Sequence, residues 1–184
     1  MTHSGQLLIR DARDSDKEVI RSLMLNAYSQ YEQVLPAERW VPYRESISSS
    51  VDGDGPIARI VAEIDGRVVG SVQMYISGEV AYGRPELNLH SPIIRLLAVS
   101  PDVRGRGIAT ELIRESVRRS VALGATTLHL HTSDMMESAV KLYERLGFER
   151  ASDKDIMNGE TLVKSYRLQW SDHAEISHLV GQQA

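Results

Sequence analysis

The chain contains no cysteine among its 184 residues, which excludes disulfides, thiolate nucleophiles and cysteine-ligated metal sites. Basic residues are not in excess, because 21 lysines and arginines stand against 25 aspartates and glutamates, for a formal net charge of −4. Nucleic acids and anionic membranes select basic surfaces, so we expect neither as a partner. No stretch approaches the ~18 apolar residues of a membrane span, and Met1–Gln6 lacks a basic and apolar leader. We therefore expect a soluble cytoplasmic protein.

The chain does contain enough apolar residues for one core. Hydrophobic residues make up 42% of the sequence, which suits a single compact domain and leaves little chain for a second. Residues 1–170 are expected to form this domain. Residues 171–184 form a polar tail with modest helical potential, and we expect this tail to be mobile.

The most informative segment joins an apolar strand to an amphipathic helix through a basic turn. Ile93–Val99 is almost entirely aliphatic, as a strand buried on both faces requires, and from Ile108 the apolar residues recur at helical spacing. Arg104-Gly105-Arg106-Gly107 lies between them. The glycines let the backbone turn tightly, so that the N–H groups opening the helix point at an anion, and the arginines add charge. An ordinary strand-to-helix turn would use the same glycines, but the combination favours a phosphate-binding turn.

Two better-known phosphate-binding loops do not match this turn. A dinucleotide fingerprint needs a third glycine where Thr110 stands, and a nucleoside-triphosphatase loop needs Gly-Lys followed by Ser or Thr. The residues that do match are Arg104, Gly107 and Ala109, in the pattern Arg-x-x-Gly-x-Ala. This pattern resembles the pyrophosphate-binding motif of the GNAT superfamily of acyl-CoA-dependent N-acetyltransferases.

A second segment, Ser138–Phe148, supports the same resemblance. It is similar to the family's second signature, Ala-x-x-Leu-Tyr-x-x-x-Gly-Phe, at the usual distance after the first. On a helical projection Tyr143 lies at the edge of the apolar stripe, where its ring packs while its hydroxyl reaches a cleft. A purely structural tyrosine would show the same pattern.

The resemblance covers Leu7 to about Trp170 and implies the GNAT fold. This fold is α+β, with a central, splayed, mixed and mostly antiparallel sheet of about seven strands flanked by about four helices. The sequence patterns agree with it: Ile57–Ile64 and Val68–Ile76 read as a hairpin, and a second helix is expected after Pro42. Ser77–Ser91 reads as a long loop.

The resemblance also implies how acetyl-CoA, the expected co-substrate, is bound. Its pyrophosphate would lie on the N–H groups of Arg104–Thr110, and its pantetheine arm along Leu97–Val99. A backbone N–H near Leu97 or Ala98 would stabilise the tetrahedral oxyanion. No metal is expected, because His129 and His131 share a strand face without a third ligand. The predicted cofactor-binding residues are Leu97, Ala98, Val99, Arg104, Gly105, Arg106, Gly107, Ile108, Ala109 and Thr110.

By the same resemblance, Tyr143 is the catalytic general acid that protonates the departing sulfur. Since no cysteine exists to carry an acyl group, we expect direct attack within a ternary complex. The general base is open, because Ile93 stands where many family members carry a glutamate. A second departure is Met136, where related proteins often place an asparagine. The candidates for the base are Glu86, His90, Asp134, His129, His131 and water.

Two functions fit these observations. The first is an N-acetyltransferase that moves acetyl from acetyl-CoA to a primary amine of a small molecule, peptide or protein. The second is a non-catalytic acyl-CoA-binding sensor, because a fold and a cofactor loop do not guarantee turnover. Acceptor selectivity is expected in Ser77–Ser91 and in Tyr28–Tyr43. The sequence leaves the acceptor and the oligomeric state, including a homodimer, unspecified.

Overall fold

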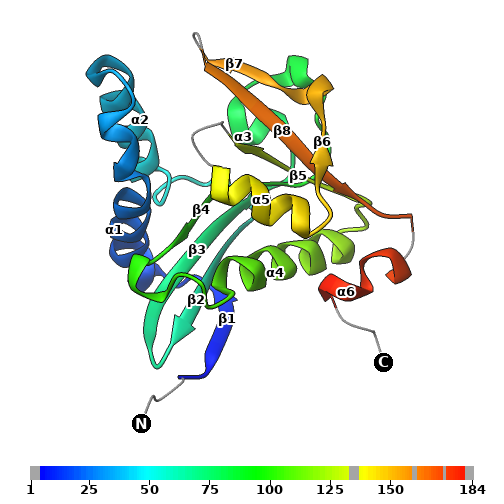
Figure 1. Cartoon of the computed structure of the whole chain (residues 1–184), viewed down its shortest axis with the longest axis horizontal. Helices are drawn as coiled ribbons and strands as arrows, with labels where there is room; N and C mark the ends of the chain where they lie inside the picture. The colour runs from blue at the N-terminus through cyan, green and yellow to red at the C-terminus, as the bar shows by residue number, and fades with distance from the viewer. Residues whose placement is uncertain (1–4, 133–136, 159–160, 172, 181–184) are drawn as a thin grey trace. The chain divides into compact units, whose positions relative to one another are not determined.

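The computed structural model describes residues 5–132, 137–158, 161–171 and 173–180. Its chain divides into two compact units. The first consists of Met1–Gln73 and Leu96–Ile113, and the second of Met74–Arg95 and Arg114–Ala184. Each unit is a layer of hydrogen-bonded strands with helices packed on it (Figure 1).

The first unit is built on a predicted hairpin. Its strand order is β1-β2-β3-β4, and β1 pairs antiparallel with β2 from Leu7↔Ile64 to Asp11↔Ile60. A two-residue turn with positive φ at both Asp65 and Gly66 joins β2 to β3, which confirms the hairpin. The strands are β1 (Leu7–Asp11), β2 (Ala58–Ile64), β3 (Arg67–Tyr75) and β4 (Ile93–Val99).

Two helices of this unit pack against each other (Figure 1). They are α1 (Lys17–Tyr28) and α2 (Ala37–Ser49), with the 3₁₀ turns η1 (Asp14–Asp16) and η2 (Ser29–Gln33) before and after α1. Val19 of α1 is 40% exposed, whereas Ile20, Leu23, Met24 and Tyr28 are buried. The expectation that α2 follows Pro42 is wrong. The helix starts after Pro36, whose carbonyl accepts from the Trp40 N–H at 2.9 Å, and contains Pro42.

The second unit is organised around β8. β5 runs antiparallel to it from Thr127↔Gln169 to Thr132↔Lys164, and the short strands β6 and β7 also pair with it. The sequence patterns did not predict β7. The first residues of β4 lie parallel to β5, at Ile93↔His129 and Ile94↔Leu130. The strands are β5 (Thr127–Thr132), β6 (Glu149–Arg150), β7 (Ile156–Asn158) and β8 (Thr161–Gln169).

Segment 77–91 is more regular than the predicted loop. It contains the helix α3 (Gly78–Tyr82) and the 3₁₀ turn η3 (Pro85–Leu87). The Ser77 hydroxyl caps α3 by accepting from the Val80 N–H at 3.3 Å. The segment shares a small core with the flanking strands, made of its own Ala81 and Leu89 together with Tyr75 of β3 and Ile93 of β4, and Tyr82 and Leu87 pack against it.

The polar tail also contains regular structure. It forms the 3₁₀ turn η7 (His173–Ile176) and the short helix α6 (Ser177–Val180). Ile176 and Leu179 are buried, because their spacing places both on one side of this turn of helix. The described part of the tail, 171 and 173–180, therefore contributes two buried side chains, and its mobility stays a prediction.

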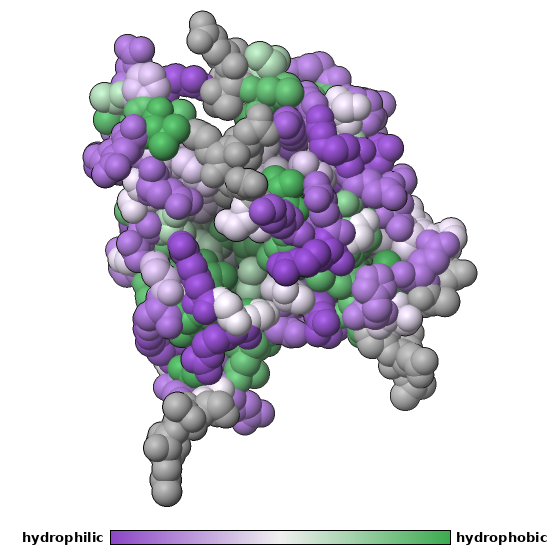
Figure 2. Space-filling model, viewed as in Figure 1, coloured by the Kyte–Doolittle hydropathy of each residue, from purple (hydrophilic) through white to green (hydrophobic). Residues whose placement is uncertain are grey.

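The strands together form an open, mixed, eight-stranded sheet with β7 off the main path, which confirms the predicted α+β class with one strand more than expected. Among the described residues, four helices have nine residues or more: α1, α2, α4 (Ile108–Ala122) and α5 (Glu137–Arg145). Figure 2 shows mainly hydrophilic residues over the outer side of α4, as its amphipathic pattern predicts. None of the described helices combines the length and apolar character that spanning a membrane requires.

Candidate active site

The predicted phosphate-binding turn has the backbone that its glycines suggest. Gly105 and Gly107 have φ values of 79° and 77°, in the left-handed region that other residues rarely adopt. A Cβ built on either glycine would have no neighbour within 4 Å, so the space above the turn is open. Arg104 and Arg106 are exposed beside them. The first N–H groups of α4 have no acceptor within their own helix, so the turn offers N–H donors and positive charge in one place.

An ion pair holds the chain just before this turn. The Asp102 carboxylate accepts from the Arg67 guanidinium at 2.7 and 3.0 Å, and from the Ser100 hydroxyl. These two groups, Arg67 first, hold the pKa of Asp102 well below its usual range. Asp102 belongs to the 3₁₀ turn η4 (Pro101–Val103), whose Val103 side chain is buried. Sequence reasoning missed Arg67, because nothing in the hairpin turn signals a partner so far along the chain.

β4 contains a bulge at Leu96. Its φ of 56° lies in the left-handed region, which is unusual for leucine. The backbone contacts on either side of Leu96 show the effect. The Pro92 carbonyl accepts from His129 of β5 at 2.9 Å, whereas the Ser100 N–H donates to Val69 of β3 at 2.8 Å. In a regular strand, the N–H and C=O groups of successive residues point to opposite edges. Pro92 and Ser100 are both even-numbered, yet Pro92 bonds to β5 and Ser100 to β3. One extra residue, a bulge, must therefore lie between them.

The bulge determines which backbone groups of Leu97–Val99, the predicted pantetheine strand, point away from β3. The Ser100 N–H points to β3, and the N–H and C=O groups of Ala98, two residues earlier, point to the same edge. Leu97 and Val99 therefore carry their N–H and C=O groups on the edge away from β3. The expected oxyanion donor was Leu97 or Ala98, and this geometry favours Leu97.

Tyr143 lies in a C-terminal cap of α5 in the second unit. Its carbonyl accepts from the Phe148 N–H at 3.0 Å, and Glu144 accepts from the Gly147 N–H at 3.0 Å. With Gly147 at a φ of 99°, this is a Schellman motif, in which an apolar contact between Tyr143 and Phe148 is expected. The two rings lie 6.0 Å apart, and Tyr143 is 6% exposed. The Tyr-x-x-x-Gly-Phe signature is thus the end of a helix. This structural role requires the aromatic ring of Tyr143 but does not require its hydroxyl.

The base candidates differ in exposure. Glu86 and His90 are exposed in segment 77–91, and a His90 ring nitrogen lies 2.6 Å from the side-chain oxygen of Asn88. His129 is 5% exposed, and burial lowers its pKa to about 4. Asp134 lies outside the described residues, as does Met136. Ile93, at the position where many family members carry a glutamate, is fully buried.

His131 has a defined tautomer. Its Nε2 lies 2.8 Å from the Lys154 carbonyl, which can only accept, so Nε2 carries the proton. The Tyr82 ring packs edge-on against the imidazole at 4.9 Å. Burial lowers the pKa of His131. Within the described residues, no group of three or more His, Cys, Asp or Glu side chains is arranged to bind a metal.

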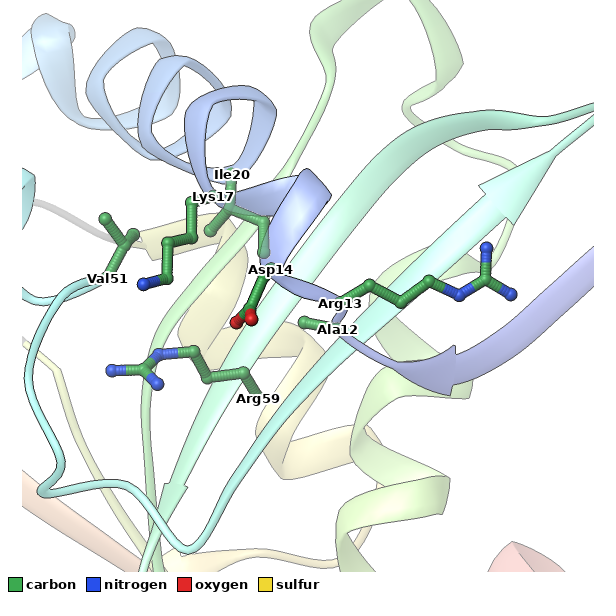
Figure 3. Close-up of a pocket in the computed structure, with 7 residues that line it drawn as sticks. All are labelled: Ala12, Arg13, Asp14, Lys17, Ile20, Val51 and Arg59. Atoms are coloured by element: carbon green, nitrogen blue, oxygen red, sulfur yellow. The ribbon is translucent and has the colours of Figure 1, made fainter.

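A small cavity of about 90 Å³ lies elsewhere in the first unit. In Figure 3 the Lys17 and Arg59 side chains extend to one side of Asp14, and Arg13 extends to the other. Ile20 and Val51 are the buried apolar part of its wall. None of these residues belongs to the predicted cofactor-binding set, so the cavity is separate from the phosphate-binding turn.

The chain belongs to the acetyltransferase (GNAT) family, whose model matches residues 18–148. An acetyltransferase of Pectobacterium atrosepticum is 33% identical over 90 residues, which cover 49% of this chain and 56% of that protein. Matches to acetyltransferases of Sodalis glossinidius and Yersinia pestis cover 66% and 64% of those proteins, so the chain spans less than two thirds of each of these relatives.

Solved structures share the fold. The PaiA N-acetyltransferase of Thermoplasma acidophilum, in complex with coenzyme A, superimposes with a TM-score of 0.66 at 13% identity, over 90% of this chain and 99% of that one. A GNAT family acetyltransferase of Brucella melitensis, in complex with acetyl-CoA, gives a TM-score of 0.60 at 21% identity, over 91% and 90% of the two chains. The predicted family and fold are therefore confirmed.

Proposed function

We propose that this protein is an N-acetyltransferase that transfers acetyl from acetyl-CoA to a primary amine of a small molecule, peptide or protein. The observation that carries this proposal is the open turn before α4, where Gly105 and Gly107 take positive φ and leave unfilled space beside two exposed arginines. Membership of the acetyltransferase (GNAT) family supports it. Relatives of the same fold were solved with coenzyme A or acetyl-CoA bound.

The turn would bind the pyrophosphate of acetyl-CoA. Backbone N–H groups from Arg104 to Thr110 donate to the phosphate oxygens, and the α4 dipole favours the negative charge. The full set of residues in this role is Leu97, Ala98, Val99, Arg104, Gly105, Arg106, Gly107, Ile108, Ala109 and Thr110. Of these, Leu97 and Val99 offer amide groups on the edge of β4 away from β3, where the pantetheine arm can pair with them.

Transfer would proceed by direct attack in a ternary complex. The neutral amine attacks the thioester carbonyl, and the resulting oxyanion accepts from the Leu97 N–H. Such a donor typically contributes about 3 kcal/mol. As the C–S bond breaks, the Tyr143 hydroxyl protonates the departing thiolate, and the proton that the attached nitrogen loses as the amide forms restores this hydroxyl by way of water. Before the attack, one proton leaves the substrate ammonium to Glu86, His90, Asp134 or water, and the exposure of Glu86 and His90 suits that role better than the burial of His129.

A direct test is release of free thiol from acetyl-CoA in the presence of a panel of amines, including polyamines, amino acids, aminoglycosides and N-terminal peptides. We expect thiol release with at least one class and none without an acceptor. Acetyl-CoA binding measured by calorimetry, with no turnover on any amine, would instead support a non-catalytic acyl-CoA sensor. The observation that favours this second function is the buried Ile93 at a position where many family members carry a glutamate.

The remaining parts of the proposal concern the whole protein. Residues 1–170 are proposed as the acetyltransferase domain. The absence of cysteine and the net charge of −4 support a cytoplasmic location and argue against nucleic acid as a partner. A homodimer stays a prediction, which sedimentation velocity can test.

A further inference from the structure

The Tyr28 side chain extends from α1 to the backbone of β4. Its hydroxyl donates to the Leu97 carbonyl at 3.3 Å. Leu97 carries its amide groups on the edge of β4 away from β3, as the Ser100 contact with Val69 shows. Tyr28 therefore reaches the same backbone edge that is proposed to bind the thioester.

The Tyr28 ring is fixed by its neighbours. It is 6% exposed and lies 5.9 Å from the Tyr31 ring and 6.3 Å from the Tyr43 ring, the latter edge-on at 88°. Trp40 packs edge-on against Tyr43 at 6.1 Å and extends the cluster. A buried ring with such contacts keeps one rotamer, so its hydroxyl is held at the Leu97 carbonyl without further ordering.

Tyr28 contacts β4 directly after the residue whose backbone conformation is least usual for a strand. Leu96, directly before Leu97, has a φ of 56°. A bulky residue persists in this conformation only where its surroundings determine it, and such positions gather at functional sites. A hydrogen bond to the Leu97 carbonyl restrains the Leu97–Ala98 peptide group and, through the Leu97 Cα, limits the rotation of the Leu96–Leu97 peptide group that carries the Leu97 N–H.

We propose that Tyr28 is a positioning residue for acetyl transfer, which holds the Leu97 carbonyl so that the Leu97 N–H stays aimed at the thioester oxygen. The inference rests on the proposed acetyltransferase function. Tyr28 does not take part in proton transfer, and its effect reaches the reacting atoms through the Leu97 backbone. A misdirected donor weakens the transition state, where the oxygen carries charge, more than it weakens the bound thioester.

The test compares Tyr28→Phe with Tyr166→Phe, using the amine found to be acetylated. Tyr28→Phe keeps the ring and its aromatic contacts, and removes only the oxygen. We expect its kcat to fall about 2- to 10-fold, the range that loss of one neutral hydrogen bond corresponds to, while the KM values for the amine and for acetyl-CoA change less than about twofold. Tyr166→Phe makes the same change at an equally buried tyrosine of β8, outside the segments proposed to bind acetyl-CoA or the amine, and should leave kcat unchanged.

A spectroscopic measurement without any amine reads the contact itself. In Tyr28→Phe the carbonyl-carbon resonance of Leu97 and the amide resonance of Ala98, which belong to one peptide group, should shift, and in Tyr166→Phe they should not. An unchanged kcat in Tyr28→Phe, an equal fall in Tyr166→Phe, or a raised amine KM with unchanged kcat would each overturn the inference. Wild-type protein that acetylates no amine would reject the proposed function instead, so the two failures are distinguishable.

Discussion

Arg67 and Asp102 form a two-pronged ion pair, with Nη1 to Oδ2 at 2.7 Å and Nη2 to Oδ1 at 3.0 Å. The pair joins the first residue of β3 to the 3₁₀ turn that leads into Gly105 and Gly107. Two parallel bonds fix the direction of both side chains as well as their separation. The pair therefore holds the start of the turn proposed to bind phosphate against the hairpin of the first unit.

Breaking this pair should weaken acetyl-CoA binding. We expect Arg67→Met to raise the dissociation constant for acetyl-CoA by about twofold to fivefold, a small effect because both side chains are more than half exposed to solvent. Isothermal titration calorimetry measures it. Arg21→Met is the matched control, because Arg21 pairs with Glu18 and Asp52 in the same unit, at 2.7 and 2.8 Å, away from the turn. Equal losses in the two variants would contradict the positioning role.

Gly107→Glu should abolish acetyl-CoA binding, because it places bulk and negative charge where the pyrophosphate is proposed to lie. The substitution also strains a backbone at a φ of 77°. Gly124→Glu separates the two effects, since Gly124 has a φ of 80° and equally open space but lies after α4. Calorimetry on both folded variants should find binding lost in the first and kept in the second. Unchanged affinity in Gly107→Glu would reject the turn as the cofactor site.

Tyr143→Phe should lower kcat by about 10²-fold, near the lower end of general-acid contributions, because a thiolate is already a good leaving group. The KM for acetyl-CoA should change little, since the proton is needed only as the C–S bond breaks. Folding should be preserved, because the ring that packs on Phe148 remains. Steady-state kinetics and thermal unfolding together decide the role. Full kcat in Tyr143→Phe with a lower Tm in Tyr143→Ala would make the residue purely structural.

Lys154→Met should change the KM for the amine rather than the KM for acetyl-CoA. The Lys154 ammonium donates to the carbonyls of Leu87 and Asn88 at 2.8 and 3.3 Å, and so anchors the segment proposed to select the acceptor. Loss of the anchor should raise the amine KM about threefold to tenfold, less than the full value of a charged hydrogen bond, because the contact with Asn88 is exposed and the effect on the amine is indirect. Lys141→Met, an exposed lysine of α5, is the control. A change confined to the KM for acetyl-CoA would show that the segment is misassigned.

His129 should make the protein less stable in acid. Burial, and then the nearby His131, lower its folded-state pKa to about 4, whereas the unfolded chain protonates near 6.5. The unfolded state therefore binds the extra proton first, and stability that is complete above about pH 6.5 is lost as the pH falls toward about 4. Urea unfolding across this range should show a smaller decline in His129→Leu than in the wild type. His90→Leu, at an exposed histidine, should retain the full decline.

The sequence predicted the features that short-range patterns determine. Alternating apolar residues around Asp65-Gly66 specified a hairpin, and the change to helical spacing at Ile108 marked the start of α4. The predicted turn is present, with positive φ at both glycines. These features depend on residues close in the chain, which is why one sequence was enough.

Short-range patterns did not predict contacts between residues that lie far apart in the chain. The bulge at Leu96 has no local signal, because leucine is an ordinary strand residue and nothing in Ile93–Val99 interrupts the apolar run. Tyr28 meets Leu97 only through the packing of α1, 69 residues earlier in the chain. The start of α2 was misjudged because two prolines, Pro36 and Pro42, compete as helix starts.

Segment 77–91 is closed at its base, where the Gly78 N–H donates to the Leu89 carbonyl at 2.7 Å. It also packs on a small apolar core, and both of its ends lie in the second unit. A segment built in this way is exchangeable at its tip: Gly83 to Glu86, which precede the Leu87 and Asn88 contacts with Lys154, can be lengthened or replaced while the closed base keeps the strands on either side in register. If the segment selects the acceptor as proposed, a laboratory library confined to these four positions would change the acceptor and leave the proposed cofactor turn untouched.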